Sequence, residues 1–251
     1  MDVLTVKNLS VSFYRPTGEI EAVKNVSFSL QPGEILVIMG DTGCGKSVLC
    51  KSIVKLLPDI ARIKTGQIFF QGKEITDYTE KEMQELRGTS FSMVFQNPMT
   101  ALNPCMSVGA QIAEAVRLRC PEISRRELRN RVIELLELVE LDCPKERAGQ
   151  YPFQLSGGMA QRCVIATALA ANPAVLFADE PTTSLDTEVQ AQILDLFLEL
   201  REKMGMAVIF ITHNPKVAAR VADRVALMRD GELYRIGDAE EIFEETIYNH
   251  H

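Results

Sequence analysis

The residues best suited to chemistry form one run directly after a short apolar stretch. The run matches the pattern GxxxxGK[ST] and consists of Gly40, Asp41, Thr42, Gly43, Cys44, Gly45, Lys46 and Ser47. Its glycines let backbone N–H groups surround phosphate oxygens, and the helix that begins there adds a favourable field. Lys46 would reach the β- and γ-phosphates of a nucleotide, and the Ser47 hydroxyl would ligate Mg²⁺. The run therefore predicts a nucleotide-binding loop.

Two carboxylates follow another apolar run, and they suit the same chemistry. Asp179 and Glu180 come directly after Val175–Ala178. An aspartate at the carboxyl end of a buried strand can hold Mg²⁺, and the following glutamate can orient, or take a proton from, the attacking water. Such a pair alone is commonly just a strand end. With the phosphate loop present, we interpret both acids as site residues.

A third segment, Leu155-Ser156-Gly157-Gly158, opens an amphipathic helix. It is a second helix N-terminus suited to phosphate, whereas one nucleotide needs only one such site from a single chain. A capped helix start would explain Ser156 but not the two glycines. We therefore expect a dimer, in which each nucleotide lies between one subunit's glycine loop and the other's Ser156, Gly157 and Gly158.

The elements that must position these residues can be read from the hydrophobic pattern. The apolar runs at 34–39, 175–178 and 208–212 are each followed by helical periodicity, at 47–57, 187–204 and 215–222. Strand, turn and helix in repetition predict a parallel α/β core. The first 30 or so residues alternate apolar and polar side chains, which favours antiparallel strands beside that core.

The middle of the chain, residues 97–154, is expected to be a helical insertion into the core. Its apolar residues recur at helical spacing, with arginine and glutamate on the opposite face. The stripe consists of Leu128, Val132, Leu135, Leu136 and Val139.

Composition excludes several classes of protein. The chain has 251 residues, 46% hydrophobic and 24% charged, which excludes a disordered chain and a disulfide-stapled miniprotein. Its 27 basic and 34 acidic residues give a net charge of −7, which argues against a protein that wraps nucleic acid. Apolar stretches fall short of the roughly 20 residues of a membrane span, and no secretory signal is visible. We expect a cytoplasmic protein.

Cysteine and histidine usage adds little chemistry. No CxxC spacing occurs, so free buried thiols in a reducing cytosol are expected rather than disulfides or zinc ligands. The six cysteines are Cys44, Cys50, Cys105, Cys120, Cys143 and Cys163. His250 and His251 resemble the start of an affinity tag and receive no chemical role.

Three of these segments resemble the motifs of ABC-type ATPases. Gly40–Ser47, Leu155–Gln161 and Ala178–Asp186 are similar to the Walker A, signature and Walker B/D-loop motifs, in the family's order and across essentially the whole chain. The resemblance implies an α/β P-loop core with an antiparallel β subdomain, formed by residues 1–96 and 155–251. The helical subdomain would be the insertion at 97–154.

The resemblance also assigns roles outside the three motifs. Gln96 would be the Q-loop glutamine that touches Mg²⁺ or the lytic water, and Asp186 would communicate across the dimer. His213 would contact the γ-phosphate. Phe13, favoured over Tyr14, would stack on adenine, although an aromatic among early strands is about as often part of a core.

Three positions depart from the family pattern without removing a catalytic group. Ala160 stands where many importers have arginine, and Asn214-Pro215 replaces the common Asp-Leu after the H-loop histidine.

In the mechanism that the resemblance implies, ATP closes the dimer between Lys46 and the partner's signature serine. Hydrolysis then reopens it.

Within the family, the chain is most similar to the peptide and nickel importer branch, through Gln96–Pro104, Tyr151–Gln154 and Pro181–Asp186. ATPases of this branch usually form heterodimers beneath two transmembrane permease subunits, fed by an extracytoplasmic binding protein, at the cytoplasmic face of the membrane. A homodimer is the alternative. Because peptide-type members often carry a longer cysteine-containing C-terminal extension, the length of this chain favours the nickel or metal type. Peptides remain an open alternative as cargo.

Two other classes fit less well. A non-transport ABC ATPase acting on nucleic acid or ribosomes would need a coiled-coil insertion, a zinc module or tandem nucleotide domains. A P-loop kinase or GTPase would share Gly40–Ser47 but would have no use for Leu155–Gly158.

Overall fold

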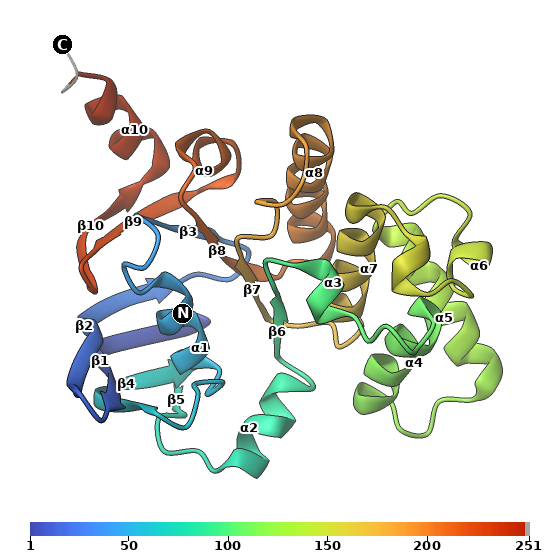
Figure 1. Cartoon of the computed structure of the whole chain (residues 1–251), viewed down its shortest axis with the longest axis horizontal. Coiled ribbons are helices and arrows are strands. Elements are labelled where there is room, and N and C mark those ends of the chain that lie inside the picture. Colours follow the sequence, from blue (N-terminus) through green and yellow to red (C-terminus); the bar gives the residue numbers. More distant parts are fainter. Residues whose placement is uncertain (249–251) are drawn as a thin grey trace. The chain divides into compact units, whose positions relative to one another are not determined.

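The computed structural model describes residues 1–248 of the chain (Figure 1). His250 and His251, read above as the start of a tag, lie outside the described residues. The chain divides into two compact units, which are described separately. The first comprises Met1–Gln84 and Gly205–His251, and the second comprises Glu85–Met204.

The first unit contains an antiparallel sheet. Its strands, in the order β2-β1-β4-β5, are β1 (Leu4–Arg15), β2 (Gly18–Leu30), β4 (Ala61–Phe70) and β5 (Lys73–Glu74). The expected antiparallel strands within the first 30 residues are confirmed, with Val6 opposite Phe28 and Val11 opposite Val23. The sequence does not predict β4, because Lys64, Thr65 and Gly66 interrupt its apolar pattern.

A second set of strands in the first unit runs in the order β10-β9-β3-β8. These are β3 (Ile35–Met39), β8 (Ala207–Thr212), β9 (Arg224–Arg229) and β10 (Glu232–Asp238). Strand β3 is parallel to both β8 and β9, and the residues from Ile35 to Ile38 are fully buried. Because Met39 lies opposite Thr212, the loops after β3 and β8 leave the sheet at the same edge.

Helices α1 (Lys46–Ile53), α9 (Pro215–Val221) and α10 (Ala239–Tyr248) belong to the same unit. The helix expected at 47–57 ends at Ile53 because Lys55 adopts a left-handed φ of +52°. Pro58 also restricts the residue before it, which disfavours helix. Helix α2 (Glu80–Arg87) crosses the boundary between the two units.

The second unit has two parallel strands and most of the helices. Strand β6 (Phe91–Val94) pairs with β7 (Val175–Asp179), and the rings of Phe91 and Phe177 meet edge to face with centroids 5.7 Å apart. The helices are α3 (Pro98–Ala101), α4 (Val108–Arg119), α5 (Arg125–Leu138), α6 (Pro144–Arg147), α7 (Gly157–Leu169) and α8 (Thr187–Met204). Helix α7 is central, since it contacts β6, α3, α4, α5 and α8. The stripe predicted on α5 is buried as expected.

Cysteine burial differs in part from expectation. All six cysteines are free, as predicted, but only Cys44, Cys50 and Cys163 are buried. The other three (Cys105, Cys120 and Cys143) are exposed, because they lie in connections or at helix ends rather than on packed faces. Among the described residues, no helix is both long and apolar enough to cross a membrane.

Candidate functional site

The glycine loop connects β3 to α1, and two of its glycines are required for space. A Cβ atom on Gly40 would lie 2.1 Å from the carbonyl oxygen of Met228, and one on Gly45 would lie 2.3 Å from that of Ala22. Gly45 also takes a left-handed φ of +111° as the N-cap of α1. The loop therefore keeps its backbone N–H groups next to the start of α1, which suits a bound anion.

Lys46 brings a positive charge into this loop. Its side chain is buried, and its Nζ atom donates hydrogen bonds to the carbonyls of Gly40 and Asp41, both at 2.7 Å. Ser47, the other predicted phosphate and metal ligand of the loop, follows it in the first turn of α1. Neutral carbonyls leave the charge of the ammonium uncompensated, so it can attract a phosphate.

His213 follows β8 at the edge where the loop leaves β3. The turn around it is fixed, since the Asn214 amide donates to Thr212 Oγ1 and the Lys216 amide donates to Asn214 Oδ1, both at 3.0 Å. Pro215 occupies the first turn of α9, where its missing N–H costs nothing. The unusual Asn214-Pro215 pair is thus a helix cap that holds His213 in an exposed turn.

Phe13 lies on β1 in the first unit, opposite Ile20 and Ala61. It is half-buried, whereas the adjacent Tyr14 is 46% exposed. Stacking of Phe13 on adenine stays a prediction.

In the second unit, two side chains donate hydrogen bonds to the carboxylate of Glu180. Strands β6 and β7 run in parallel with Val94 opposite Ala178, so Gln96 after β6, Asp179 at the end of β7 and Glu180 after it lie at the same edge of the strand pair. Gln96 Nε2 donates to Glu180 Oε2 at 3.3 Å, and Thr183 Oγ1 donates to the same oxygen at 2.9 Å. Asp179 is buried. The sequence predicts Gln96 as a site residue but does not predict Thr183. The position of Thr183 three residues after Glu180, with a hydroxyl that can reach the carboxylate, could have indicated it.

The signature segment forms the exposed start of α7. Ser156 caps the helix by accepting a hydrogen bond from the Met159 amide at 3.3 Å, and both Ser156 and Gly157 are exposed. A Cβ on Gly158 would lie 2.5 Å from Cγ1 of Val189, so glycine allows α7 to pack closely on α8. Asp186 caps α8 through a 3.0 Å bond from the Val189 amide to its Oδ1 atom.

The donor atoms present fit Mg²⁺, which prefers oxygen ligands and usually takes only one or two carboxylates together with phosphates. The candidates are the Ser47 hydroxyl in the first unit, and Gln96 and Asp179 in the second. Within the described part of the chain, no group of three histidine, cysteine or acidic side chains would hold a metal alone.

The chain is similar in sequence to one protein family and to several known proteins. The family model described as ABC transporter matches residues 23–183. The oligopeptide transport ATP-binding protein OppD of Bacillus subtilis (strain 168) is 49% identical over 242 residues, 96% of this chain and 67% of OppD. The dipeptide transport ATP-binding protein DppD of the same organism is 50% identical over 242 residues, 96% of this chain and 72% of DppD.

A more distant relative and a solved structure agree with these two. The glutathione import ATP-binding protein GsiA of Escherichia coli O1:K1 / APEC is 44% identical over 248 residues, 96% of this chain and 40% of GsiA. The dimeric post-hydrolysis structure of the ATP-binding cassette MJ0796, bound to ADP and Pi, superposes with a TM-score of 0.84. It is 30% identical and covers 94% of this chain and 98% of that one.

These relatives test two predictions, membership of the ABC family and membership of its nickel or metal type. None of the three named relatives is called a nickel protein, so the expected metal-type subunit stays a prediction. The α/β fold with an antiparallel β subdomain and helical parts is confirmed. From its motifs, its fold and these similarities, the chain belongs to the ABC transporter family.

Proposed function

We propose that this chain is the ATP-binding and ATP-hydrolysing subunit of an importer for dipeptides or oligopeptides. The observation that carries the proposal is the glycine loop with its buried Lys46, in a chain about half identical to the peptide transport proteins OppD and DppD. Nickel or another metal is the second candidate cargo. It remains a candidate because Gln96–Pro104 is similar to the branch of importers that includes both peptide and nickel types.

The binding step follows from the first unit. The loop's N–H groups and Lys46 would hold the β- and γ-phosphates of ATP, and Phe13 would stack on the adenine. Mg²⁺ bound with ATP would neutralise phosphate charge, held by Ser47, Gln96 and Asp179. The exposed His213 would donate a hydrogen bond to the γ-phosphate.

The hydrolytic step would use Glu180 as the group that orients the attacking water and accepts its proton. Hydrogen bonds from Gln96 and Thr183 to Oε2 fix the orientation of this carboxylate.

The site would be completed by a second ATPase subunit. Ser156 and Gly157 are exposed at the start of α7, where helix N–H groups can donate hydrogen bonds to the γ-phosphate of a nucleotide held by the partner. The partner would be a different ATPase subunit in a heterodimer, or a second copy. ATP-driven closure would act through residues 97–154 on two transmembrane permease subunits. An extracytoplasmic binding protein would deliver the cargo to these permease subunits. We place the chain at the cytoplasmic face of the membrane, with no nucleic-acid partner.

Trapping the closed dimer tests the catalytic assignment. We expect Glu180→Gln to bind ATP, to hydrolyse it at least 100-fold more slowly, and to dimerise in size-exclusion chromatography with ATP. Adding Ser156→Arg should abolish that dimer. The matched control is Ser124→Arg, since Ser124 also caps a helix with a 3.3 Å bond, to the Glu127 amide at the start of α5. A dimer that survives Ser156→Arg would contradict the shared site.

The cargo is tested with the assembled transporter. We expect the complex purified from native membranes to contain permease subunits, and its ATPase rate to rise with di- or oligopeptides in the presence of the binding protein. Stimulation by nickel and not by peptides would favour the second candidate.

A further inference from the structure

A strongly basic segment lies in the second unit of this acidic chain. Residues 117–131 contain the glutamates Glu122 and Glu127, so the segment's formal charge is 6 − 2 = +4. The six basic residues are all arginines: Arg117, Arg119, Arg125, Arg126, Arg129 and Arg131. None of them belongs to a motif of the proposed ATP site.

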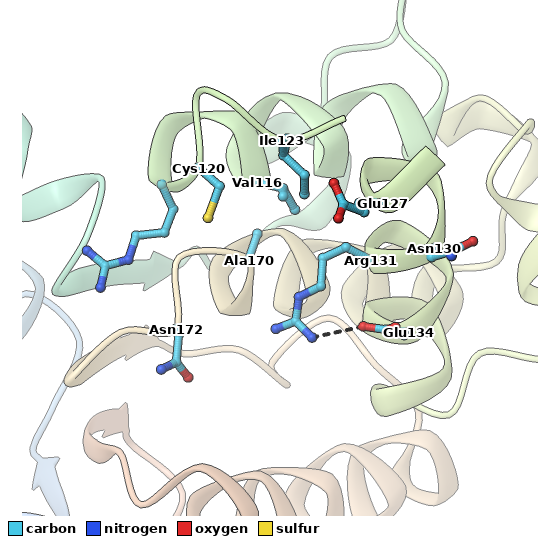
Figure 2. A pocket seen from close by; sticks show the side chains of 10 residues that line it. Val116, Cys120, Ile123, Glu127, Asn130, Arg131, Glu134, Ala170 and Asn172 are labelled. Atoms are coloured by element: carbon cyan, nitrogen blue, oxygen red, sulfur yellow. Dashed lines mark hydrogen bonds and ion pairs between the residues drawn. The ribbon is translucent and has the colours of Figure 1, made fainter. Parts of the chain in front are cut away.

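Five of the six arginines are exposed and unpaired. Arg131 is neutralised by Glu134, with its Nη1 atom 3.2 Å from Glu134 Oε2, at the wall of a pocket of about 820 Å³ (Figure 2). The other five form no ion pair with any side chain in the described part of the chain. Together with Leu118 we call them the arginine corner, which comprises Arg117, Leu118, Arg119, Arg125, Arg126 and Arg129.

The corner gathers at one end of a helix pair. Helix α4 ends at Arg119 and the contacting helix α5 begins at Arg125, with only residues 120–124 between them (Figure 1). The charges therefore lie around a single short connection.

Helix stability does not explain this placement. Arg125 and Arg126 occupy the first two positions of α5, where the positive end of the helix dipole disfavours cations. The capping box of Ser124 and Glu127 supplies one compensating charge, but the first turn, with two arginines and one glutamate, keeps a net charge of +1. An anionic partner would relieve the repulsion.

Leu118 decides what kind of anion fits. Its side chain is 68% exposed in the last turn of α4, between Arg117 and Arg119. A phosphate backbone would leave this side chain in water, and residues 117–131 contain no aromatic ring on which bases could stack. A lipid surface offers both anionic headgroups for the arginines and an apolar layer for Leu118.

We propose that the arginine corner binds the anionic headgroups of a membrane surface, with Leu118 entering the interface. The corner is a peripheral lipid contact of the ATPase subunit itself, in addition to any contact with permease subunits. It goes beyond the proposed transport function, because it needs neither ATP nor cargo.

Vesicle binding of the purified 251-residue chain tests the proposal. We expect co-sedimentation with vesicles of 30% phosphatidylglycerol in phosphatidylcholine, and none with pure phosphatidylcholine. Arg125→Gln, Arg126→Gln and Arg129→Gln together should weaken partitioning roughly 100-fold, since each arginine near an anionic surface contributes about a factor of five to ten. The matched control carries Lys7→Gln, Lys81→Gln and Lys145→Gln, which remove the same charge at exposed positions elsewhere.

Leu118→Ser separates interfacial insertion from electrostatics. We expect it to weaken binding several-fold without changing the slope of binding against salt, whereas Ile60→Ser, at a residue 48% exposed in the first unit, should have no effect. An environment-sensitive fluorophore on the exposed Cys120 should shift to the blue on anionic vesicles, and one on the exposed Cys143 should not.

Three outcomes would overturn the proposal. They are equal vesicle binding by the wild type and the arginine variant, no binding by the wild type, and arginine-dependent binding to a soluble polyanion without binding to vesicles. ATPase activity should be unchanged in all of these variants. Failure of the lipid contact is therefore distinguishable from failure of the proposed transport function.

Discussion

Glu180 is constrained in both its backbone and its side chain. Its φ of +47° is left-handed, which is unfavourable for a residue with a Cβ and costs on the order of 1–3 kcal/mol. Two donors, Gln96 and Thr183, meet at its Oε2 atom. Strain that the surrounding structure holds in place is common where a carboxylate must keep one orientation. It supports the proposed role of Glu180 as the base.

Thr183 is predicted to act through this carboxylate. Thr183→Val removes the 2.9 Å hydrogen bond while keeping the volume, so we expect kcat to fall roughly 10-fold with little change in KM for ATP. Thr183→Ser should retain most of the rate, because it keeps the hydroxyl. Steady-state ATPase kinetics of the two variants provide the measurement. An unchanged kcat in Thr183→Val would contradict the role.

Gly40 tests whether the loop tolerates a side chain. In Gly40→Ala the new methyl would meet the Met228 carbonyl at 2.1 Å, and a backbone oxygen within a strand pair cannot turn away. We expect ATP binding to weaken at least 10-fold and the melting temperature to fall, as measured by calorimetry. Gly149→Ala, whose nearest contact is an ordinary 3.5 Å, is the control and should change neither.

At the scale of elements, α7 connects the signature to the rest of the second unit. Arg162 of α7 is buried, and its Nη1 atom donates to the carbonyl of Val139 at 2.6 Å and to Glu140 Oε2 at 3.2 Å. Val139 is the C-cap of α5, so this arginine satisfies a carbonyl that the helix itself leaves unbonded. The same bond fixes α7, and hence Ser156 at its start, against α5.

We expect removal of the Arg162 hydrogen bonds to lower the stability of the folded chain substantially. In Arg162→Met the Val139 carbonyl loses its donor, and we expect the free energy of unfolding to fall by about 1–3 kcal/mol in urea titrations. Arg131→Met is the matched control, since Arg131 is half-exposed and paired only with exposed Glu134 at 3.2 Å. Its loss should stay below about 0.5 kcal/mol. Equal losses in the two variants would show that the α7–α5 bond contributes nothing special.

At the scale of the whole molecule, burial rather than sequence spacing determines which cysteine thiols are reactive. Cys163 lies within α7, and burial raises the pKa of its thiol to about 12. A raised pKa means that the thiol stays protonated at neutral and mildly alkaline pH. It is therefore a poor nucleophile in the folded chain.

Thiol titration checks this distribution. At pH 8 the native chain should react with Ellman's reagent at Cys105, Cys120 and Cys143, while the buried Cys44, Cys50 and Cys163 remain protected. All six should react in guanidinium. Peptide mass spectrometry after alkylation identifies the sites. Fast labelling of Cys163 at pH 8 would contradict the packing of α7.

Local features were predictable from the sequence, and distant contacts were not. Gly40–Ser47 after an apolar run, Ser156 before a helix and Asp179-Glu180 after a strand are each defined by neighbours in the chain. Sterics and helix capping determine such features over a few residues, so they can be read without a structure.

Only the tertiary structure decided which distant groups meet. Gln96 and Glu180 are 84 residues apart, and they bond because β6 and β7 pair in parallel with Val94 opposite Ala178. The tertiary structure likewise decided that Arg162 bonds to the Val139 carbonyl. It also left the five arginines near the exposed Leu118 without an ion pair in the described part of the chain. Register and packing set these contacts and exposures, and both depend on the balance of interactions over the fold rather than on adjacent residues.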